Sequence, residues 1–195
     1  MMKIAKLSAY ILAALIMMTA CGGDENYTPK PRGYFRINTP NLEYQTLQVD
    51  CPFTFEYNKA AEWQPTRFKC WGDVYYPSIK ARLQLTYKPV TPENLDTLLG
   101  DGHELAFKHV VKADGISEKL YTDEQREVYG ILYKIKGEAA TNTQFFMTDS
   151  TDHFLRGVLY FYAEPNEDSL QPVNDYMYEE VVHLIETLKW QNSLP

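Results

Sequence analysis

Alternation of hydrophobic and polar positions predicts β-strands along most of the chain beyond residue 34. The clearest run occupies residues 79–88, where every second side chain is apolar and its neighbours are charged or polar. Such period-two alternation places one face of a strand in a core and the other face in water. The apolar positions of this run are Ile79, Ala81, Leu83, Leu85 and Tyr87.

Aromatic and β-branched stretches predict further strands. These stretches occupy residues 44–49, 53–57, 67–76, 128–135, 144–147 and 154–162. The last two are separated by TDSTDH at 148–153, a cluster of turn-forming residues that suits the loop of a hairpin.

Apolar residues spaced three and four apart predict two helices. The first begins near Thr91 and Pro92 and extends to Val111, although two glycines, Gly100 and Gly102, weaken its middle and permit a kink there. The second extends from about residue 172 to residue 188 and should close the core. On this helix, adjacent acidic residues at 179 and 180 indicate a solvated face rather than an acid–base pair.

The order of these elements predicts an α+β domain over residues 34–195. Strands in runs, with one helix between two groups and one at the end, favour a largely antiparallel sheet flanked by two main helices. The order also resembles that of the Mog1/PsbP-like α/β/α sandwich. A chain of 195 residues is large enough for one well-buried core.

The first part of the chain has the features of a lipoprotein signal peptide. Residues 1–20 combine two lysines with an apolar run from Leu7 to Met18, which is shorter than the about 20 residues of a membrane-spanning helix. The segment Met-Thr-Ala-Cys that ends at Cys21 resembles the lipobox of bacterial lipoproteins, so we expect cleavage before Cys21 and lipidation of that residue. The alternative is an ordinary signal peptide that leaves Cys21 as a free thiol.

The residues after Cys21 predict a tether and a location. Residues 21–33 contain the lipidated cysteine and GGDENYTPKPRG, which has almost nothing apolar to bury and predicts a flexible linker. Gly22 stands where an inner-membrane retention signal would place aspartate, so we expect anchoring in the outer membrane, facing the periplasm. Asp24 and Glu25 loosely resemble the acidic cluster of surface-exposed lipoproteins, and a polar tether explains them equally well.

The charge balance argues against nucleic acid as a partner. The chain has 19 Lys and Arg against 26 Asp and Glu, a net charge of −7. Lys3 and Lys6 leave with the signal peptide, so the mature chain has 17 basic residues against 26 acidic ones and a net charge of −9. Such a chain has no general means of neutralising phosphates or anionic headgroups.

The sequence lacks the short motifs of the commonest catalytic and cofactor sites. It contains no P-loop, GxGxxG, HExxH, GxSxG or CxxC motif, and we predict no catalytic residue, cofactor or metal ligand. His103 and His109 are six residues apart on a predicted helix and therefore on opposite faces, where they cannot bind one metal together. His183 is expected at the surface of the last helix.

One cluster supports an alternative hypothesis, that of an envelope hydrolase or metal-dependent enzyme. Asp149, Ser150, Asp152 and His153 bring a nucleophile, an imidazole and two carboxylates within five residues. Catalytic triads are assembled from separated segments, because adjacent residues in a tight turn rarely reach the required geometry. A divalent ion would need oxygen ligands beyond the two aspartates. Turn chemistry is therefore the favoured interpretation of this cluster.

Cys51 and Cys70 are the two cysteines that remain after Cys21, and in an oxidising periplasm they could form a disulfide. If residues 51–57 and 67–76 form a simple hairpin, Cys51 lies near Val74. That register separates the two thiols, so free cysteines are slightly favoured over a disulfide.

Aromatic residues make up 14% of the chain, and some of those on strands must face outward. A core filled with rings is the favoured explanation. An exposed aromatic patch would instead favour contact with a protein or a glycan, which keeps a glycan- or peptide-binding module as a further alternative. The residues concerned include Trp63, Trp71, Tyr75, Tyr76, Tyr160, Phe161 and Tyr162.

Segments distributed over the whole mature chain carry a family resemblance. Besides the lipobox cysteine they are CPFTFEY at 51–57, YP at 76–77, LTYKPV at 85–90, HVVKADGISE at 109–118, GILY at 130–133, TDSTDHFLRGVLYFYAEPNEDSL at 148–170 and ETLKW at 186–190. Together they resemble the gliding-motility lipoprotein GldD family of Bacteroidetes. The resemblance implies a role in gliding or in the type IX secretion apparatus. Only Cys21 is carried over from the family, as the lipid attachment site, and no catalytic residue is carried over.

The sequence therefore favours a non-catalytic envelope lipoprotein that acts through contacts with other envelope proteins of a gliding or type IX secretion assembly. Its contact with the membrane is expected through the lipid on Cys21. No nucleic acid is expected as a partner, and the sequence identifies no small-molecule substrate.

Overall fold

A computed structural model describes residues 38–108, 113–137, 141–162 and 167–191. The expected signal peptide and tether, with Cys21, lie outside the described residues. The strands are β1 (Tyr44–Thr46), β2 (Phe53–Thr54), β3 (Glu56–Asn58), β4 (Glu62–Pro65), β5 (Gly72–Tyr76), β6 (Ala81–Pro89), β7 (Ala113–Asp123), β8 (Val128–Gly137), β9 (Thr143–Thr148), β10 (His153–Phe161) and β11 (Lys189–Trp190). The helices are α2 (Leu95–Phe107) and α3 (Glu167–Thr187).

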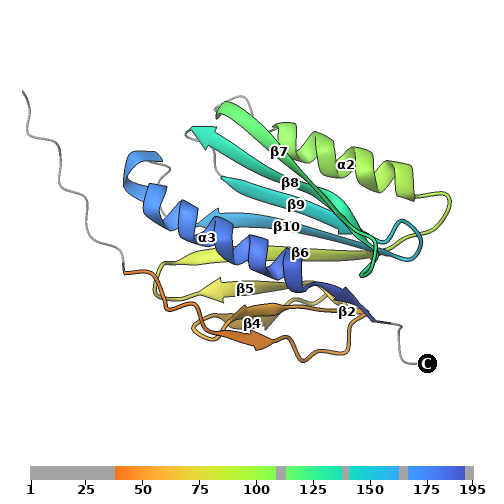
Figure 1. The fold of residues 1–195 in the computed structure, drawn as a ribbon, viewed down its shortest axis with the longest axis horizontal. Coiled ribbons are helices and arrows are strands. Elements are labelled where there is room, and N and C mark those ends of the chain that lie inside the picture. Colours follow the sequence, from red (N-terminus) through yellow and green to blue (C-terminus); the bar gives the residue numbers. More distant parts are fainter. Residues whose placement is uncertain (1–37, 109–112, 138–140, 163–166, 192–195) are drawn as a thin grey trace, which may run out of the picture. The chain divides into compact units, whose positions relative to one another are not determined.

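Seven of the strands form one antiparallel sheet, in the order β4-β5-β6-β10-β9-β8-β7 (Figure 1). The alternation predicted for residues 79–88 is confirmed on β6, where Ala81, Leu83 and Leu85 are buried while Gln84 is exposed. The predicted hairpin between the strands at 144–147 and 154–162 is also present, with Phe154 opposite Thr148.

The two helices pack on opposite faces of the sheet (Figure 1). Strand β9 shows the division, because Phe145 and Met147 belong to the core that includes α3, whereas Phe146 between them belongs to the core that includes α2. Successive side chains of a strand point to opposite faces, so β9 contributes to both cores. The expected α+β fold, with a large antiparallel sheet and two flanking helices, is thus confirmed.

The helix boundaries differ from those expected. Helix α2 ends at Phe107 rather than Val111, and it continues through both of its glycines. Gly102 packs against the ring of Phe146, where a Cβ atom would lie 2.8 Å from Cδ1, so its presence has a packing reason. Helix α3 begins at Glu167, so that Pro172 lies inside it rather than at its start.

The N-terminal strands do not form the hairpin that the sequence suggested. Strand β2 pairs with β11 and β3 pairs with β1, in two small two-stranded sheets. Strand β5 pairs instead with β4, where Trp63 lies opposite Val74, and with β6 on its other side. The long edge strand β7 was not predicted either.

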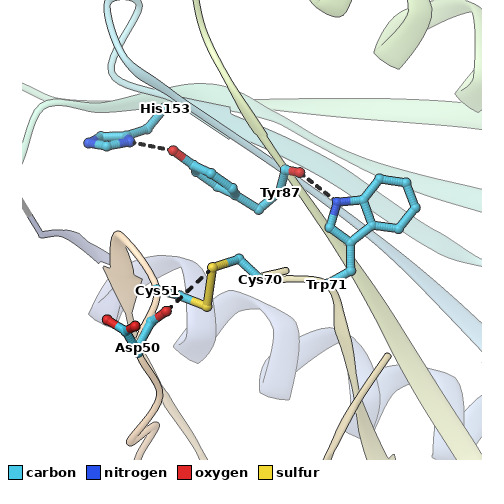
Figure 2. The surroundings of a disulfide bond; sticks show 6 residues. All are labelled: Asp50, Cys51, Cys70, Trp71, Tyr87 and His153. Carbon is cyan, nitrogen blue, oxygen red and sulfur yellow. Dashed lines mark hydrogen bonds between the residues drawn. A yellow bond between two sulfur atoms is a disulfide. The ribbon is translucent and has the colours of Figure 1, made fainter. Parts of the chain in front are cut away.

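Cys51 and Cys70 form a disulfide, with a Cα–Cα distance of 5.5 Å (Figure 2). The expectation of free thiols was therefore wrong. It rested on a hairpin between residues 51–57 and 67–76, whereas β4 occupies that position beside β5. Cys51 precedes β2 and Cys70 lies in the turn before β5, so the bond joins a small sheet to the large one.

Candidate functional site

The enzyme-like cluster lies in the turn between β9 and β10, and the carboxylate of Asp149 organises that turn. Its Oδ1 accepts hydrogen bonds from the backbone N–H groups of Thr151, Asp152 and His153 at 3.0, 2.9 and 2.8 Å. Local bonds of this kind are the reason that aspartate is common in turns. The predicted turn chemistry of Asp149 is what the structure shows.

The environment of Asp149 keeps its carboxylate charged. Burial by itself would raise the pKa of Asp149, but the three backbone N–H groups and the nearby His153 outweigh it and lower the pKa below its ordinary value. Ser150, the next residue, has a φ of 69°. This left-handed conformation is uncommon outside glycine and belongs to the tight course of the turn.

His153 is held on three sides. Its Nδ1 shares a 2.9 Å hydrogen bond with the hydroxyl of Tyr87 on β6, and its Nε2 lies 3.9 Å from Oδ2 of Asp149. Its ring stacks on Trp190 of β11, with 5.2 Å between ring centroids and 23° between the planes. Burial, followed by the charges of Asp149 and Asp152, raises the pKa of Tyr87 to about 12, so this hydroxyl keeps its proton at neutral pH.

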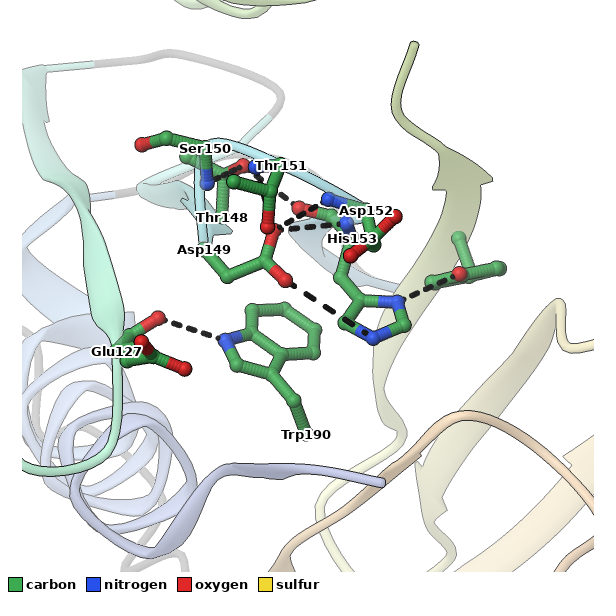
Figure 3. A network of polar contacts seen from close by, with 9 residues as sticks. Glu127, Thr148, Asp149, Ser150, Thr151, Asp152, His153 and Trp190 are labelled. Atoms are coloured by element: carbon green, nitrogen blue, oxygen red, sulfur yellow. Dashed lines mark hydrogen bonds and ion pairs between the residues drawn. The ribbon is translucent and has the colours of Figure 1, made fainter. Parts of the chain in front are cut away.

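Trp190 extends the network to a further segment. Its indole Nε1 donates a 2.9 Å hydrogen bond to the backbone oxygen of Glu127, in the turn between β7 and β8 (Figure 3). The β9–β10 turn is therefore connected through side chains to β6, to β11 and to the β7–β8 turn. Each of these contacts fixes the relative positions of strand ends.

The arrangement does not assemble a catalytic triad. Figure 3 shows the side chain of Ser150 pointing away from the imidazole of His153, and the backbone N–H of Ser150 donates to Oγ1 of Thr148 at 2.9 Å. A general base must lie within hydrogen-bond reach of the proton that it removes. Among the residues that the structure describes, no group of three His, Cys, Asp or Glu side chains is placed to hold a metal ion.

The other histidines make separate contacts. His103 on α2 shares a 3.1 Å hydrogen bond with the hydroxyl of Tyr133, and His109 lies outside the described residues. His183 on α3 is partly exposed, as expected, and its Nε2 lies 3.0 Å from Oε2 of Glu56. Its ring stacks on Tyr44 with 3.6 Å between ring centroids.

The solvated face expected for Glu179 and Glu180 is correct for the first residue and wrong for the second. Glu180 is only 4% exposed, and its carboxylate accepts hydrogen bonds from the hydroxyl of Tyr76 at 2.8 Å and from the amide of Asn58 at 3.2 Å. Glu179 is exposed. The small β1–β3 sheet packs beside α3 and covers Glu180, a long-range arrangement that the local pattern does not encode.

The tyrosines around Glu180 retain their protons. Burial, followed by the charge of Glu180, raises the pKa of Tyr76 well above its ordinary value. The same causes in the same order raise the pKa of Tyr44 to about 12. Protonated hydroxyls can donate to a carboxylate, so these residues satisfy a buried charge.

A pocket of about 480 Å³ lies beside the disulfide. We call it the aromatic groove, and it is lined by Pro52, Phe68, Lys69, Cys70, Trp71, Tyr87 and Pro89. Figure 2 shows Trp71, Tyr87 and the disulfide around this region, where the indole Nε1 of Trp71 donates a 2.7 Å hydrogen bond to the backbone oxygen of Tyr87. The aromatic residues singled out from the sequence are thus divided, since Tyr76 is buried, Trp71 is partly buried and Tyr162 is 60% exposed.

A family model described as gliding motility lipoprotein GldD matches residues 24–190. The chain belongs to the GldD family. The match covers all the helices and strands described above. By its description GldD is a lipoprotein family, which implies a lipid-anchored protein of the cell envelope, and it is not a known family of enzymes. No curated protein matches the chain.

In the described part of this GldD protein, neither helix has the length and apolar character needed to cross a membrane. The sequence pattern predicted the turn at Asp149 and His153, but it did not indicate the partners Tyr87, Trp190 and Glu127. Two of these partners lie in segments that carry the GldD resemblance, LTYKPV and ETLKW, and this was the available signal.

Proposed function

We propose that this GldD protein is a non-catalytic lipoprotein that supports gliding motility or type IX secretion in Bacteroidetes through contacts with other envelope proteins. The observation that supports the absence of catalysis is the arrangement of the polar side chains in the Asp149–His153 turn. Its reactive groups hold strand ends together or, in the case of Ser150, point away from the imidazole. Membership of a family named for gliding motility supports the cellular role.

We further propose that the protein is anchored through a lipid on Cys21 in the outer membrane and faces the periplasm. The support is the apolar leader, the lipobox-like residues before Cys21 and the absence of aspartate at position 22. Several acyl chains would hold the protein permanently, since each buried methylene contributes about 0.8 kcal/mol. The tether at 21–33 would keep the folded part close to the membrane.

The anchor is tested on protein purified from separated inner and outer membranes. Mass spectrometry of the N-terminal peptide should show cleavage before Cys21 and the mass of attached acyl chains, in the outer-membrane fraction. A Cys21→Ala variant should keep its leader or leave the membrane pellet, at wild-type abundance by immunoblot. An unmodified Cys21 in a membrane-bound mature chain would refute this part of the proposal.

A further inference from the structure

We propose that the aromatic groove binds an extended peptide segment of a partner protein, one that carries proline or aromatic residues next to aspartate or glutamate. The inference rests on the proposed function, because it names the surface and the partner chemistry through which a docking protein would act. It is independent of where the lipid anchor is attached.

The groove exposes apolar side chains to water. Phe68 is 48% exposed, and the walls beside it include Pro52, Pro89 and the partly buried Trp71. Aromatic side chains in a concave site are the usual anchors of protein interfaces. A partner residue that filled the groove would remove this surface from water.

The groove is also preformed. The disulfide joins Cys70 in its wall to Cys51, and Cys70 has a φ of 61°, a left-handed conformation that fixes the turn from Phe68 to Trp71. The hydrogen bond from Trp71 to the backbone of Tyr87 holds the indole against β6. A surface ordered before binding loses less conformational entropy when a ligand arrives.

The polar groups of the groove favour a peptide over a sugar. The indole N–H of Trp71 is already bonded to the backbone of Tyr87, and the hydroxyl of Tyr87 is bonded to His153. The remaining side chain in the lining with a hydrogen-bonding group is Lys69. A sugar needs several well-placed polar partners, whereas proline and aromatic side chains need few. Grooves lined by aromatic residues are known to accept extended, proline-containing peptides.

The charges beside the groove indicate an acidic partner. Arg67 lies with its guanidinium 4.8 Å from the centroid of the Phe68 ring, and Lys69, the residue after Phe68, lines the groove. Neither cation forms an ion pair with an acid among the residues that the structure describes. In a chain with a net charge of −7, one cation on the Phe68 ring and another in the lining of the groove favour a ligand with carboxylates.

The test uses the full mature protein, purified in detergent with its anchor and its disulfide, as bait for a display library of random peptides of about ten residues. The variants are Phe68→Ala and Lys69→Glu, both at exposed positions, so that folding is retained and is checked by thermal unfolding. The matched control is Leu120→Ala, which removes a side chain 74% exposed on β7, at the opposite edge of the sheet.

We expect enriched peptides that combine acidic residues with proline or aromatic ones. Phe68→Ala and Lys69→Glu should each weaken their binding about tenfold, whereas Leu120→Ala should change it less than about twofold. The inference would be overturned if no peptide were enriched, or if the enriched peptides were basic or neutral. It would also be overturned if the enriched peptides bound Phe68→Ala as tightly as the wild type, or if the groove bound neutral oligosaccharides in place of peptides. Fractionation and complementation test the proposed function separately, so either can fail without the other.

Discussion

Tyr76 on β5 donates a 2.8 Å hydrogen bond to Oε2 of Glu180 on α3, across the interface between the sheet and the helix. The other carboxylate oxygen of Glu180 accepts from Asn58 on β3, which is fully buried. One buried charge therefore joins the large sheet, the last helix and the small N-terminal sheet. A buried charge is tolerated in a protein when hydrogen bonds of this kind surround it.

Replacement of Glu180 by leucine should lower the free energy of unfolding by about 2–4 kcal/mol, because Tyr76 and Asn58 lose a charged acceptor. Glu179→Leu is the matched control on the same helix, and at its exposed position we expect a change within about 0.5 kcal/mol. Urea unfolding of both variants measures the difference. Equal stability of the two variants would contradict the role given to Glu180.

Replacement of Asp149 by alanine should lower the free energy of unfolding by about 1–3 kcal/mol, because three backbone N–H groups lose their acceptor. Asp152→Ala is the control, because Asp152 contributes to this turn through its backbone N–H, which alanine retains. We expect it to lower the free energy of unfolding by less than about 0.5 kcal/mol. Chemical denaturation at pH 7 compares the two variants.

The same carboxylate should make stability depend on acid pH. The pKa of Asp149 is lowered by folding, so its contribution is fully present above the unfolded pKa of about 4 and is lost as the pH falls through the lower folded value. Asp149→Asn should remove part of the acid-induced loss that the wild type shows in unfolding measured from pH 7 to pH 2. An unchanged acid profile would mean that Asp149 is not stabilised in its charged form.

Loss of the disulfide should lower the free energy of unfolding by about 3 kcal/mol, as expected for a loop closed over a sequence separation of 19. The variant with both Cys51→Ser and Cys70→Ser should match the wild type treated with a reducing agent. Guanidinium unfolding with and without reductant compares them. A wild type whose unfolding midpoint does not respond to reduction would show that the bond does not form.

The two glycines of α2 should respond oppositely to alanine. A Cβ atom at Gly100 would meet nothing within 4 Å, so Gly100→Ala should raise stability by about 0.5–1 kcal/mol through helix propensity. At Gly102 the new Cβ would press on the ring of Phe146, and we expect a loss of about 1–2 kcal/mol. Thermal unfolding of the two variants measures both changes. If alanine raised stability at both positions, Gly102 would not pack against the sheet.

The parts of the fold that were predictable are those with a strong local pattern. The alternation on β6 and the turn residues at 148–153 identified a half-buried strand and a hairpin, because burial on one face and turn chemistry leave a direct trace in sequence. Strand β7 was missed because it lies at the sheet edge and includes exposed residues such as Glu118, Lys119 and Leu120. Edge strands often lack a continuous apolar face.

Only the contacts between sequence neighbours in the candidate site were predictable. Asp149 and its turn follow from neighbouring residues, whereas Tyr87 and Trp190 approach His153 from β6 and β11, which are distant in sequence. Glu180 and the Cys51–Cys70 disulfide were misjudged for the same reason, since both depend on how the N-terminal segments pack against α3 and β5.

Complementation of a gliding bacterium that lacks its own GldD separates docking at the membrane, the role that we propose for this protein, from catalysis. Surface spreading and protein secretion are measured with wild type, Ser150→Ala and Cys21→Ala at equal expression. We predict full activity for Ser150→Ala, which removes the nucleophile of the rival enzyme hypothesis, and loss of activity for Cys21→Ala. If a folded, membrane-bound Ser150→Ala protein lost function, or if the protein kept full function without Cys21, the protein would not act as an anchored, non-catalytic docking protein.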